Sequence, residues 1–513
     1  MAQSDTAAAG AGAGAAAEDF DVSQRTDVPK LRKGAVGLGG VLFLTVTGSA
    51  PITAMMLNVP IMVGSGEGIG APAAFVFASI VLVVFSVGYV AMARKKTTTG
   101  GFYSFISHGL GRELGLGTGY AAVVAYSVFE ASLAGGFAYF LHNRLATYNV
   151  NISWPWLALG MVALIGVLTY FDVSFSSKIL AVGLVTEVLI LIVFDIALFA
   201  RGHSPSVSSI NPVNAFKAFP GQGKLAAGTV GLGLFFAFWS WVGFEMAPNY
   251  GEESRDPKRN VPRALYISVI GLGVFYTLTC WASLSGYAKI GDAAATADSN
   301  PYGFFLGPAG TYGGHWLASV MSYLIITGSF ACGMAFHNTT ARYFYSLGRE
   351  GMLPKALGKT HPRWQSPHVA SITQSVIAAI VIGLFAVLAT GNVANQSYIE
   401  LYGLMAVMGV IIILSVQALV SLSVAVYYLR YHRDEVHWWK TTLAPAISFV
   451  SQAIVVYLLF SNFSSVAGTS ALAKWLGPID AVVAVGGVAA AFWFRYRRPA
   501  TYEQSGRLIN EGL

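Results

Sequence analysis

Three of the acidic side chains in long apolar stretches of this sequence, where a charged group is unfavourable, are candidates for chemistry. They are Glu130 in AYSVFEASLAGG, Glu187 in LAVGLVTEVLILIVF and Glu245 in FFAFWSWVGFEMAPNYG. A carboxylate at the centre of a bilayer costs about 2.5–3.5 kcal/mol on insertion scales, so each of the three requires a functional or structural reason. Two kinds of chemistry suit such a group: reversible binding of a proton, and contact with a positively charged substrate.

Glu187 and Glu130 each allow a functional and a structural interpretation. Glu187 could act as a proton carrier, because a carboxyl group in apolar surroundings can bind and release a proton. It could equally be a permanently neutral group that hydrogen-bonds a neighbouring helix. Glu130 could contact the amine or side chain of a cationic substrate, or it could hydrogen-bond Ser127, Ser132 or an adjacent helix.

The composition indicates that these residues belong to an integral membrane protein. Of the 513 residues, 55% are hydrophobic and 11% are charged, compared with about 25% charged residues in soluble domains. So few charges make a cytosolic enzyme or a nucleic-acid binder improbable, and the net charge of +7 belongs to the loops. Cys280 and Cys332 both lie in apolar runs, so neither a disulfide framework nor a cysteine metal site is expected.

Twelve apolar stretches are long enough to cross a bilayer as helices, for which about 20 residues are needed. Their approximate limits are 35–63, 70–93, 114–141, 155–171, 179–200, 226–250, 264–287, 315–346, 369–390, 399–428, 442–462 and 475–495. With the N-terminus inside, the inner side of the membrane holds 25 of the 31 Lys and Arg residues, as the positive-inside rule requires. We therefore expect an all-α, multi-pass protein of the cell (plasma) membrane with both termini cytoplasmic.

Two of the predicted spans carry interruptions in corresponding positions. The first span contains Gly48-Ser49-Ala50-Pro51, and the sixth contains Ser240, Gly243 and Pro248 around Glu245. Paired interruptions in corresponding helices are a pointer to a transport site. Half-helix ends offer amides to a carboxylate and carbonyls to an ammonium group, which is the chemistry that a zwitterion requires.

Two long segments resemble the amino acid–polyamine–organocation (APC) superfamily of transporters, and a third, shorter segment is similar to it. The first is FFAFWSWVGFEMAPNYGEESRDPKRNVPRA at 235–264, and the second is HNTTARYFYSLGREGMLPKALGKTHPRWQSPHVA at 337–370. The third is GGFYSFISHGLGRELGLGTGY at 100–120, which is similar to the loop after the second span of that family.

The resemblance implies a five-plus-five inverted-repeat (LeuT-like) core with helices 1 and 6 interrupted, two extra C-terminal helices and alternating access around a midplane site. The expected division is a disordered cytoplasmic N-terminal tail at 1–33, the transport core at 34–428, spans 11 and 12 at 429–495, and a cytoplasmic C-terminal tail at 496–513. Family members often have G-[SA]-G in the first span. Pro51 departs from that pattern and removes one amide that could bind a carboxylate.

The resemblance also implies roles for particular residues. Glu187 falls near the position at which some proton-coupled relatives carry a lysine in place of a sodium ion. Glu245 is a gate or proton-linked candidate, and a structural hydrogen-bonding role is the alternative for it. Aromatic residues beside the break in the sixth span are candidates for a lid over the substrate, with Trp239 the first choice. The expected substrate-binding residues are Thr47, Gly48, Ser49, Ala50, Tyr126, Phe238, Trp239, Ser240 and Trp241.

These observations predict a secondary active transporter that imports a small amino acid or related amine, most simply by proton symport. Sodium coupling is the weaker option, and exchange of substrate for product is the main alternative; a sensor built on a transporter fold is a remote one. The sequence contains no recognisable catalytic motif and no metal-ligand spacing. We therefore do not expect an enzyme, a cofactor or a metal site. The expected partners are the small-molecule substrate and the lipid bilayer, with no nucleic acid, and the oligomeric state is left open.

Overall fold

The computed structural model describes residues 37–95, 101–170, 173–216, 230–250, 254–364, 366–461, 470 and 472–504. The predicted N-terminal tail at 1–33 lies outside these residues, as does the second half of the predicted C-terminal tail. The first half of that C-terminal tail is helical, because α18 continues to Arg497 and α19 occupies Pro499–Gln504.

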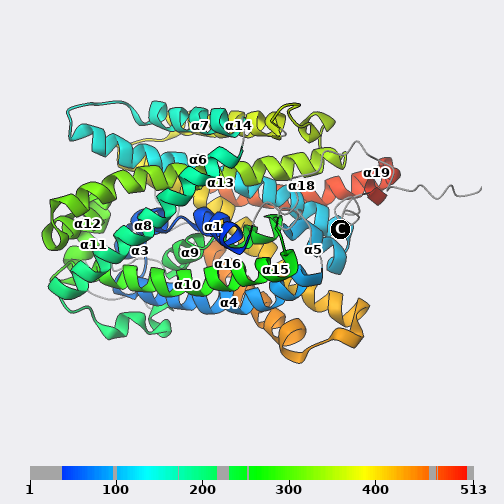
Figure 1. Cartoon of the computed structure of the whole chain (residues 1–513), viewed down its shortest axis with the longest axis horizontal. Coiled ribbons are helices and arrows are strands. Elements are labelled where there is room, and N and C mark those ends of the chain that lie inside the picture. Colours follow the sequence, from blue (N-terminus) through cyan, green and yellow to red (C-terminus); the bar gives the residue numbers. More distant parts are fainter. Residues whose placement is uncertain are drawn as a thin grey trace, which may run out of the picture.

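The described part of the chain is a bundle of helices without β-strands (Figure 1). The helices are α1 (Leu38–Ser49), α2 (Pro51–Thr53), α3 (Val59–Gly64), α4 (Ala71–Lys95), α5 (Gly101–Leu110), α6 (Arg112–Ala146), α7 (Trp154–Tyr170), α8 (Val173–Arg201), α9 (Val230–Trp239), α10 (Pro257–Ser285), α11 (Ile290–Ser299), α12 (Pro301–Pro308), α13 (His315–Arg349), α14 (His368–Leu388), α15 (Met405–Tyr431), α16 (Ala444–Ser461), α18 (Leu476–Arg497) and α19. Wider π-helical segments occur at Ala54–Asn58, Ala309–Gly313, Ala394–Leu404 and Trp438–Leu443.

Among the described residues, ten helical stretches are long and apolar enough to cross a membrane. The other two predicted spans are also helical but differ in form. The fourth is α7, which has 17 residues, and the sixth is divided into α9 and a 3-10 segment at Phe244–Tyr250. The chain is therefore a multi-pass membrane protein, whereas the count of twelve crossings stays a prediction.

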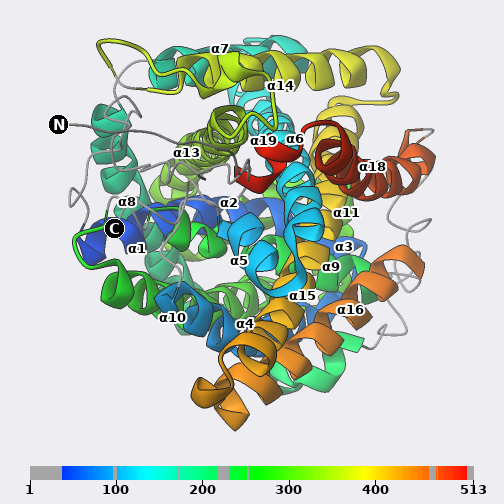
Figure 2. The same cartoon turned by 90° about the vertical axis from the view of Figure 1, so that its right-hand side faces the viewer.

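The helices form an inner group and an outer group. In the most apolar 18-residue stretch of Arg112–Ala146, and in that of Ala394–Tyr431, 89% of the stretch is buried inside the bundle. The corresponding share is 22% for Val182–Arg201 and for Ala473–Arg497. Large apolar side chains on the outer helices are exposed, as expected of surfaces in contact with lipid. Figure 2 shows α7 and α14 side by side at one edge of the bundle, opposite α4 and α16.

Two helix breaks meet at the centre of this bundle. The chain leaves α1 at Ala50, whose φ of 35° is left-handed, and re-enters a helix at Pro51. In the second break, between α9 and Phe244–Tyr250, Gly243 has a φ of 122°. A Cβ atom at Gly243 would lie 2.5 Å from the carbonyl carbon of Gly48, so glycine is required there both for its dihedral angle and for the close approach of the two backbones.

Candidate functional site

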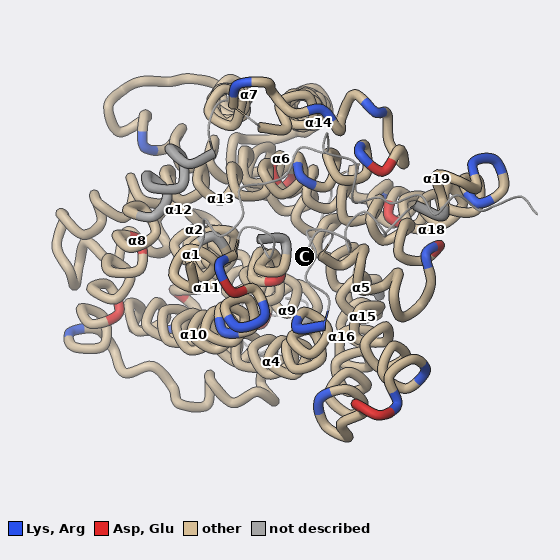
Figure 3. Tube along the Cα trace, turned by 45° about the vertical axis from the view of Figure 1, so that its right-hand side comes forward, with Lys and Arg blue, Asp and Glu red and all other residues tan. Residues whose placement is uncertain are grey.

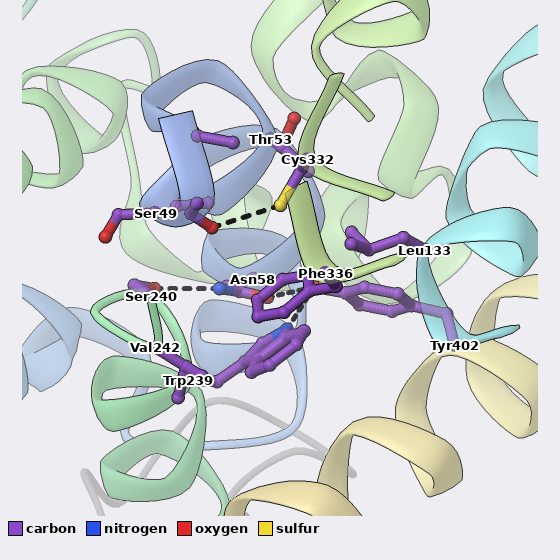
Figure 4. Close-up of a pocket in the computed structure, with 13 residues that line it drawn as sticks. Ser49, Thr53, Asn58, Leu133, Trp239, Ser240, Val242, Cys332, Phe336 and Tyr402 are labelled. Carbon is purple, nitrogen blue, oxygen red and sulfur yellow. Dashed lines mark hydrogen bonds between the residues drawn. The ribbon is translucent and has the colours of Figure 1, made fainter. Parts of the chain in front are cut away.

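A small cavity of about 20 Å³ lies beside the two breaks (Figure 4). It has room for about one water molecule, so a larger molecule enters only if the side chains around it move. No charged side chain is among its lining residues. These are Gly48, Ser49, Ala50, Thr53, Ala54, Asn58, Leu133, Trp239, Ser240, Val242, Cys332, Phe336 and Tyr402.

One wall of the cavity is a chain of hydrogen bonds that joins both broken helices to a third segment. Asn58 Nδ2 donates to Ser240 Oγ at 2.7 Å, and the hydroxyl of Tyr402 donates to Asn58 Oδ1. The indole Nε1 of Trp239 donates to the Tyr402 hydroxyl at 2.9 Å. Figure 4 shows these four side chains converging below the first break. Their mutual bonds hold Trp239 across the cavity.

The same indole also belongs to an apolar and aromatic part of the lining. The rings of Trp239 and Phe336 are stacked, with centroids 5.8 Å apart and planes 15° apart. Phe129 packs on the same indole with a centroid distance of 4.3 Å, and Leu133 lines the cavity from α6. An aliphatic group would be well accommodated by such surfaces.

Side chains of other helices form hydrogen bonds with backbone carbonyl groups at the first break. The Cys332 thiol donates to the carbonyl oxygen of Gly48 at 3.2 Å, and the hydroxyl of Tyr276 donates to the carbonyl oxygen of Ser49 at 2.9 Å. Ser49 Oγ in turn donates to the carbonyl oxygen of Trp241 at 3.3 Å, across to the second break. Each break is therefore stabilised by groups from outside its own helix.

The structure brings five of the nine expected substrate-binding residues to this cavity and separates the other four from it. Gly48, Ser49, Ala50, Trp239 and Ser240 line the cavity, whereas Thr47, Tyr126, Phe238 and Trp241 do not.

Each of these four side chains is buried elsewhere. Thr47 Oγ1 donates to the carbonyl oxygen of Phe43 within α1, and the Tyr126 hydroxyl is bonded to Glu245. Phe238 faces Phe77, and Trp241 packs on Phe75 and Tyr276.

Sequence reasoning did not select eight of the lining residues. Thr53 and Asn58 are polar residues inside the first predicted span, and that polarity was a usable signal. The remaining six are of types that are common in any membrane helix: Ala54, Leu133, Val242, Cys332, Phe336 and Tyr402.

Glu245 caps the second break. Its Oε2 accepts a hydrogen bond from the backbone N–H of Gly243 at 2.9 Å, and its Oε1 accepts one from the Tyr126 hydroxyl at 2.9 Å. The hydroxyl of Tyr89 donates to its carbonyl oxygen. Both carboxylate oxygens thus have a partner, and one of them satisfies an amide that the break removes from the helical ladder.

Glu187 approaches the first break from α8. Its carboxyl group interacts with the backbone N–H of Ile52, which is in the first turn of the helix that restarts at Pro51. A Cβ atom at Gly328 would lie 2.8 Å from Glu187 Oε1 and 3.0 Å from Thr53 Oγ1, so the glycine leaves space for the carboxylate. Within the described residues, Glu187 Oε2, Thr53 Oγ1 and Ser329 Oγ have no hydrogen-bond partner.

Glu130 lies away from the cavity in a separate buried network. Its Oε2 is 3.0 Å from His337 Nδ1 and accepts a hydrogen bond from Gln374 Nε2 at 2.7 Å. His337 Nε2 lies 2.8 Å from Ser371 Oγ and 3.1 Å from Thr169 Oγ1. This network connects α6, α7, α13 and α14, and its hydrogen bonds are with side chains other than Ser127 and Ser132.

No group of three His, Cys, Asp or Glu side chains in the described part of the chain is arranged to hold a metal ion. The chemical capacity of the site therefore consists of hydrogen bonding, apolar contact and the nearby carboxyl group of Glu187.

Comparisons with known proteins agree with this architecture. The amino acid permease family matches residues 40–479. The low-affinity putrescine importer PlaP of Escherichia coli (strain K12) is 24% identical over 340 residues, or 62% of this chain and 68% of its own length. The branched-chain amino acid permease BcaP of Bacillus subtilis (strain 168) is 20% identical over 443 residues, or 85% of this chain and 86% of its own.

The methylthioribose transporter of Bacillus subtilis (strain 168) is 22% identical over 415 residues, which are 77% of this chain and 82% of its own. These names describe transporters of small molecules and not enzymes. The chain therefore belongs to the amino acid permease family, within the APC superfamily of membrane transporters.

Proposed function

We propose that this protein is a secondary active transporter of the cell membrane that imports a small neutral amino acid together with a proton. The single observation that carries the proposal is the position of Thr53, which lines the cavity and lies with Glu187 around Gly328. One short helix thus touches both a candidate substrate site and a candidate proton site.

The neutral lining of the cavity supports an amino acid over a diamine. A zwitterion has one positive and one negative group, and both can be met by backbone carbonyls and amides at the two breaks. A diamine has two positive groups, and no acidic side chain lines the cavity among the described residues. Leu133, Val242 and Phe336 favour an aliphatic side chain on the substrate.

Glu187 is the proposed proton carrier. As a carboxylate it interacts favourably with the backbone N–H of Ile52 at the N-terminal end of α2. Protonation removes that charge and weakens the attachment of α2 to α8, so the occupancy of the proton site is transmitted to Thr53 and the cavity. Glu245 has both carboxylate oxygens bonded and is proposed to have a structural role.

The proposed transport cycle is alternating access in a twelve-helix, five-plus-five inverted-repeat fold with both termini cytoplasmic. The 25 Lys and Arg residues of the inner loops support this orientation. Because the cavity holds only about 20 Å³, substrate binding requires a side chain to move. Trp239 is the proposed lid, since swinging it outward breaks a single hydrogen bond, to Tyr402.

Uptake into proteoliposomes tests the proposal. The purified chain is reconstituted and offered labelled leucine, valine, alanine, lysine, putrescine and methylthioribose. Each compound is tested with an inward proton gradient, without a gradient, and with unlabelled substrate preloaded inside. The expected result is gradient-driven uptake of a neutral amino acid that is lost in Glu187→Gln.

A matched control is Thr186→Val, one residue away, whose hydroxyl bonds only within α8 and whose loss should leave uptake unchanged. Uptake that requires preloaded substrate and does not depend on the proton gradient would show that the protein is an exchanger and would overturn proton symport. Preference for putrescine or lysine over leucine would overturn the argument from the neutral cavity.

A further inference from the structure

A second and larger cavity, of about 620 Å³, shares no lining residue with the cavity at the helix breaks. It lies where α4 and α15 end and where α10 and the turn at Trp438–Leu443 begin, which is the end of the bundle assigned to the cytoplasmic side by the distribution of charges. Its lining consists of Val87, Val90, Ala91, Arg94, Lys95, Lys258, Tyr266, Tyr428, Glu435, His437, Lys440 and Thr441.

Four basic side chains and one acidic side chain face this cavity. Lys95 is paired with Glu435, whose Oε1 accepts a hydrogen bond from Lys95 Nζ at 2.6 Å. Arg94, Lys258 and Lys440 have no ion-pair partner among the described residues. In Figure 3 many Lys and Arg positions gather at the end of the bundle that is turned toward the viewer, including the start of α10. The cavity therefore has a surplus of positive charge that suits an anion.

The cavity continues into an apolar surface. Val87 and Ala91 line it from α4, and Ile80, two turns before Val87 on the same helix, is 52% exposed. On the flanking helices, Ile270 of α10 and Ile454 of α16 are about as exposed as Ile80. Because α4 packs against both α10 and α16, three neighbouring helices each present an exposed isoleucine, and α4 also contributes apolar residues to the cavity.

We propose that this cavity binds the phosphate headgroup of an anionic phospholipid, whose acyl chains lie along α4 between α10 and α16. Basic pockets between helices on the cytoplasmic side suit such headgroups. Arg94, Lys258 and Lys440 would contact the phosphate, and Tyr266 and Thr441 offer hydroxyl groups beside them. Trp438, which is 70% exposed, follows the lining residue His437 in the chain and is of the residue type that is enriched at membrane interfaces.

A soluble phosphate compound has the same headgroup chemistry, but the apolar surface favours a lipid. A free anion would use only the basic part of the cavity, whereas a phospholipid would also cover Val87, Ala91 and the exposed isoleucines. Burial of that apolar area adds to the electrostatic attraction, so the lipid should bind more tightly than its isolated headgroup.

The test is native mass spectrometry of the full chain in detergent, titrated with phosphatidylglycerol and, separately, with phosphatidylcholine. The double variant Lys258→Gln/Lys440→Gln removes two of the unpaired charges. At about 1 kcal/mol for each basic residue near the headgroup, phosphatidylglycerol should bind about 30-fold more weakly to this variant. The matched control is Lys355→Gln/Lys359→Gln, which removes the same charge from exposed positions near η9 (Lys355–Gly358) and should bind as the parent chain does.

The arginine version, Lys258→Arg/Lys440→Arg, should retain binding and separates loss of charge from loss of folding. Equal binding of phosphatidylglycerol to both glutamine variants would overturn the proposal, and so would equal binding of phosphatidylcholine and phosphatidylglycerol to the parent chain. Glycerol phosphate or inorganic phosphate that competes at the same concentration as the lipid would overturn the assignment to a lipid.

Discussion

The two helix breaks differ in the origin of the glutamate that serves each of them. At the first break, Glu187 comes from α8 and reaches the amide of Ile52 on another helix. At the second, Glu245 belongs to the broken segment itself and accepts the amide of Gly243, two residues away. The first arrangement depends on how two helices pack, whereas the second is largely local.

The difference extends to the remaining oxygen of each carboxylate. The second oxygen of Glu245 is occupied by the Tyr126 hydroxyl, but Glu187 Oε2 has no hydrogen-bond partner among the described residues. A carboxylate with both oxygens bonded favours a fixed structural cap. One with a free oxygen can accept a proton without breaking an existing bond, which supports Glu187 over Glu245 as the proton carrier.

The largest expected effect is at the backbone of the second break. In Gly243→Ala, the new Cβ would lie 2.5 Å from the backbone of Gly48, and the φ of 122° is unfavourable for alanine, at about 1–3 kcal/mol. We expect little folded protein, measured as the monodisperse fraction in size-exclusion chromatography and as melting temperature. Gly383→Ala, in an open position of α14, is the control, and similar behaviour of the two variants would contradict the close packing of the breaks.

The next effect separates the two glutamates. Glu187→Gln should reduce gradient-driven uptake at least tenfold while leaving exchange of preloaded substrate in place, because the carrier of the proton is lost but the cavity is intact. Glu245→Gln should lower gradient-driven uptake and exchange together, since it disturbs the cap of the second break. The reverse pattern would exchange the roles of the two residues.

A smaller effect is expected when only the side-chain partner of Glu245 is removed. Tyr126→Phe leaves one oxygen of a buried carboxylate without its donor, and hydrogen bonds to charged groups contribute about 1.5–3 kcal/mol. The melting temperature should fall, with the ratio of gradient-driven uptake to exchange unchanged. A changed ratio with unaltered melting temperature would show that Tyr126 takes part in coupling.

The smallest effect concerns the backbone of the first break. Ala50 has a φ of 35°, and this left-handed conformation costs a non-glycine residue about 1–2 kcal/mol. Glycine avoids that cost, but it loses about 0.5–1 kcal/mol more conformational entropy on folding than alanine does. Ala50→Gly should therefore stabilise the protein by about 0.5 kcal/mol, measured as a small rise in melting temperature. A marked loss of stability would mean that the Ala50 methyl group contributes to the packing around the cavity.

The features predicted best were those that depend on neighbours in the sequence. Pro51 ends a helix because it lacks an N–H group and clashes with the preceding turn, and the chain leaves α1 one residue before it. Gly243 permits a dihedral angle that other residues avoid, and the second break lies there. Family membership followed from segments whose order in the chain could be compared directly.

The hydrogen-bond partners of buried polar side chains could not be predicted from neighbouring residues in the sequence. Glu130 contacts His337, 207 positions away, and Asn58 contacts Tyr402, 344 positions away. Nothing in the local sequence marks either pair, because any polar side chain facing the bundle interior requires some partner. Four of the nine expected substrate-binding residues point away from the cavity, because a helix presents neighbouring residues to different sides.

The sequence by itself determined that the chain enters a membrane, where its helices break and which transporter family it belongs to, since hydrophobic length, proline and glycine act over a few residues. Only the tertiary structure decided which side chains surround the cavity, that Glu187 reaches the first break and that Glu130 pairs with a histidine instead of facing the cavity. These relations depend on how helices distant in the sequence pack, and on the rotation of each helix about its axis.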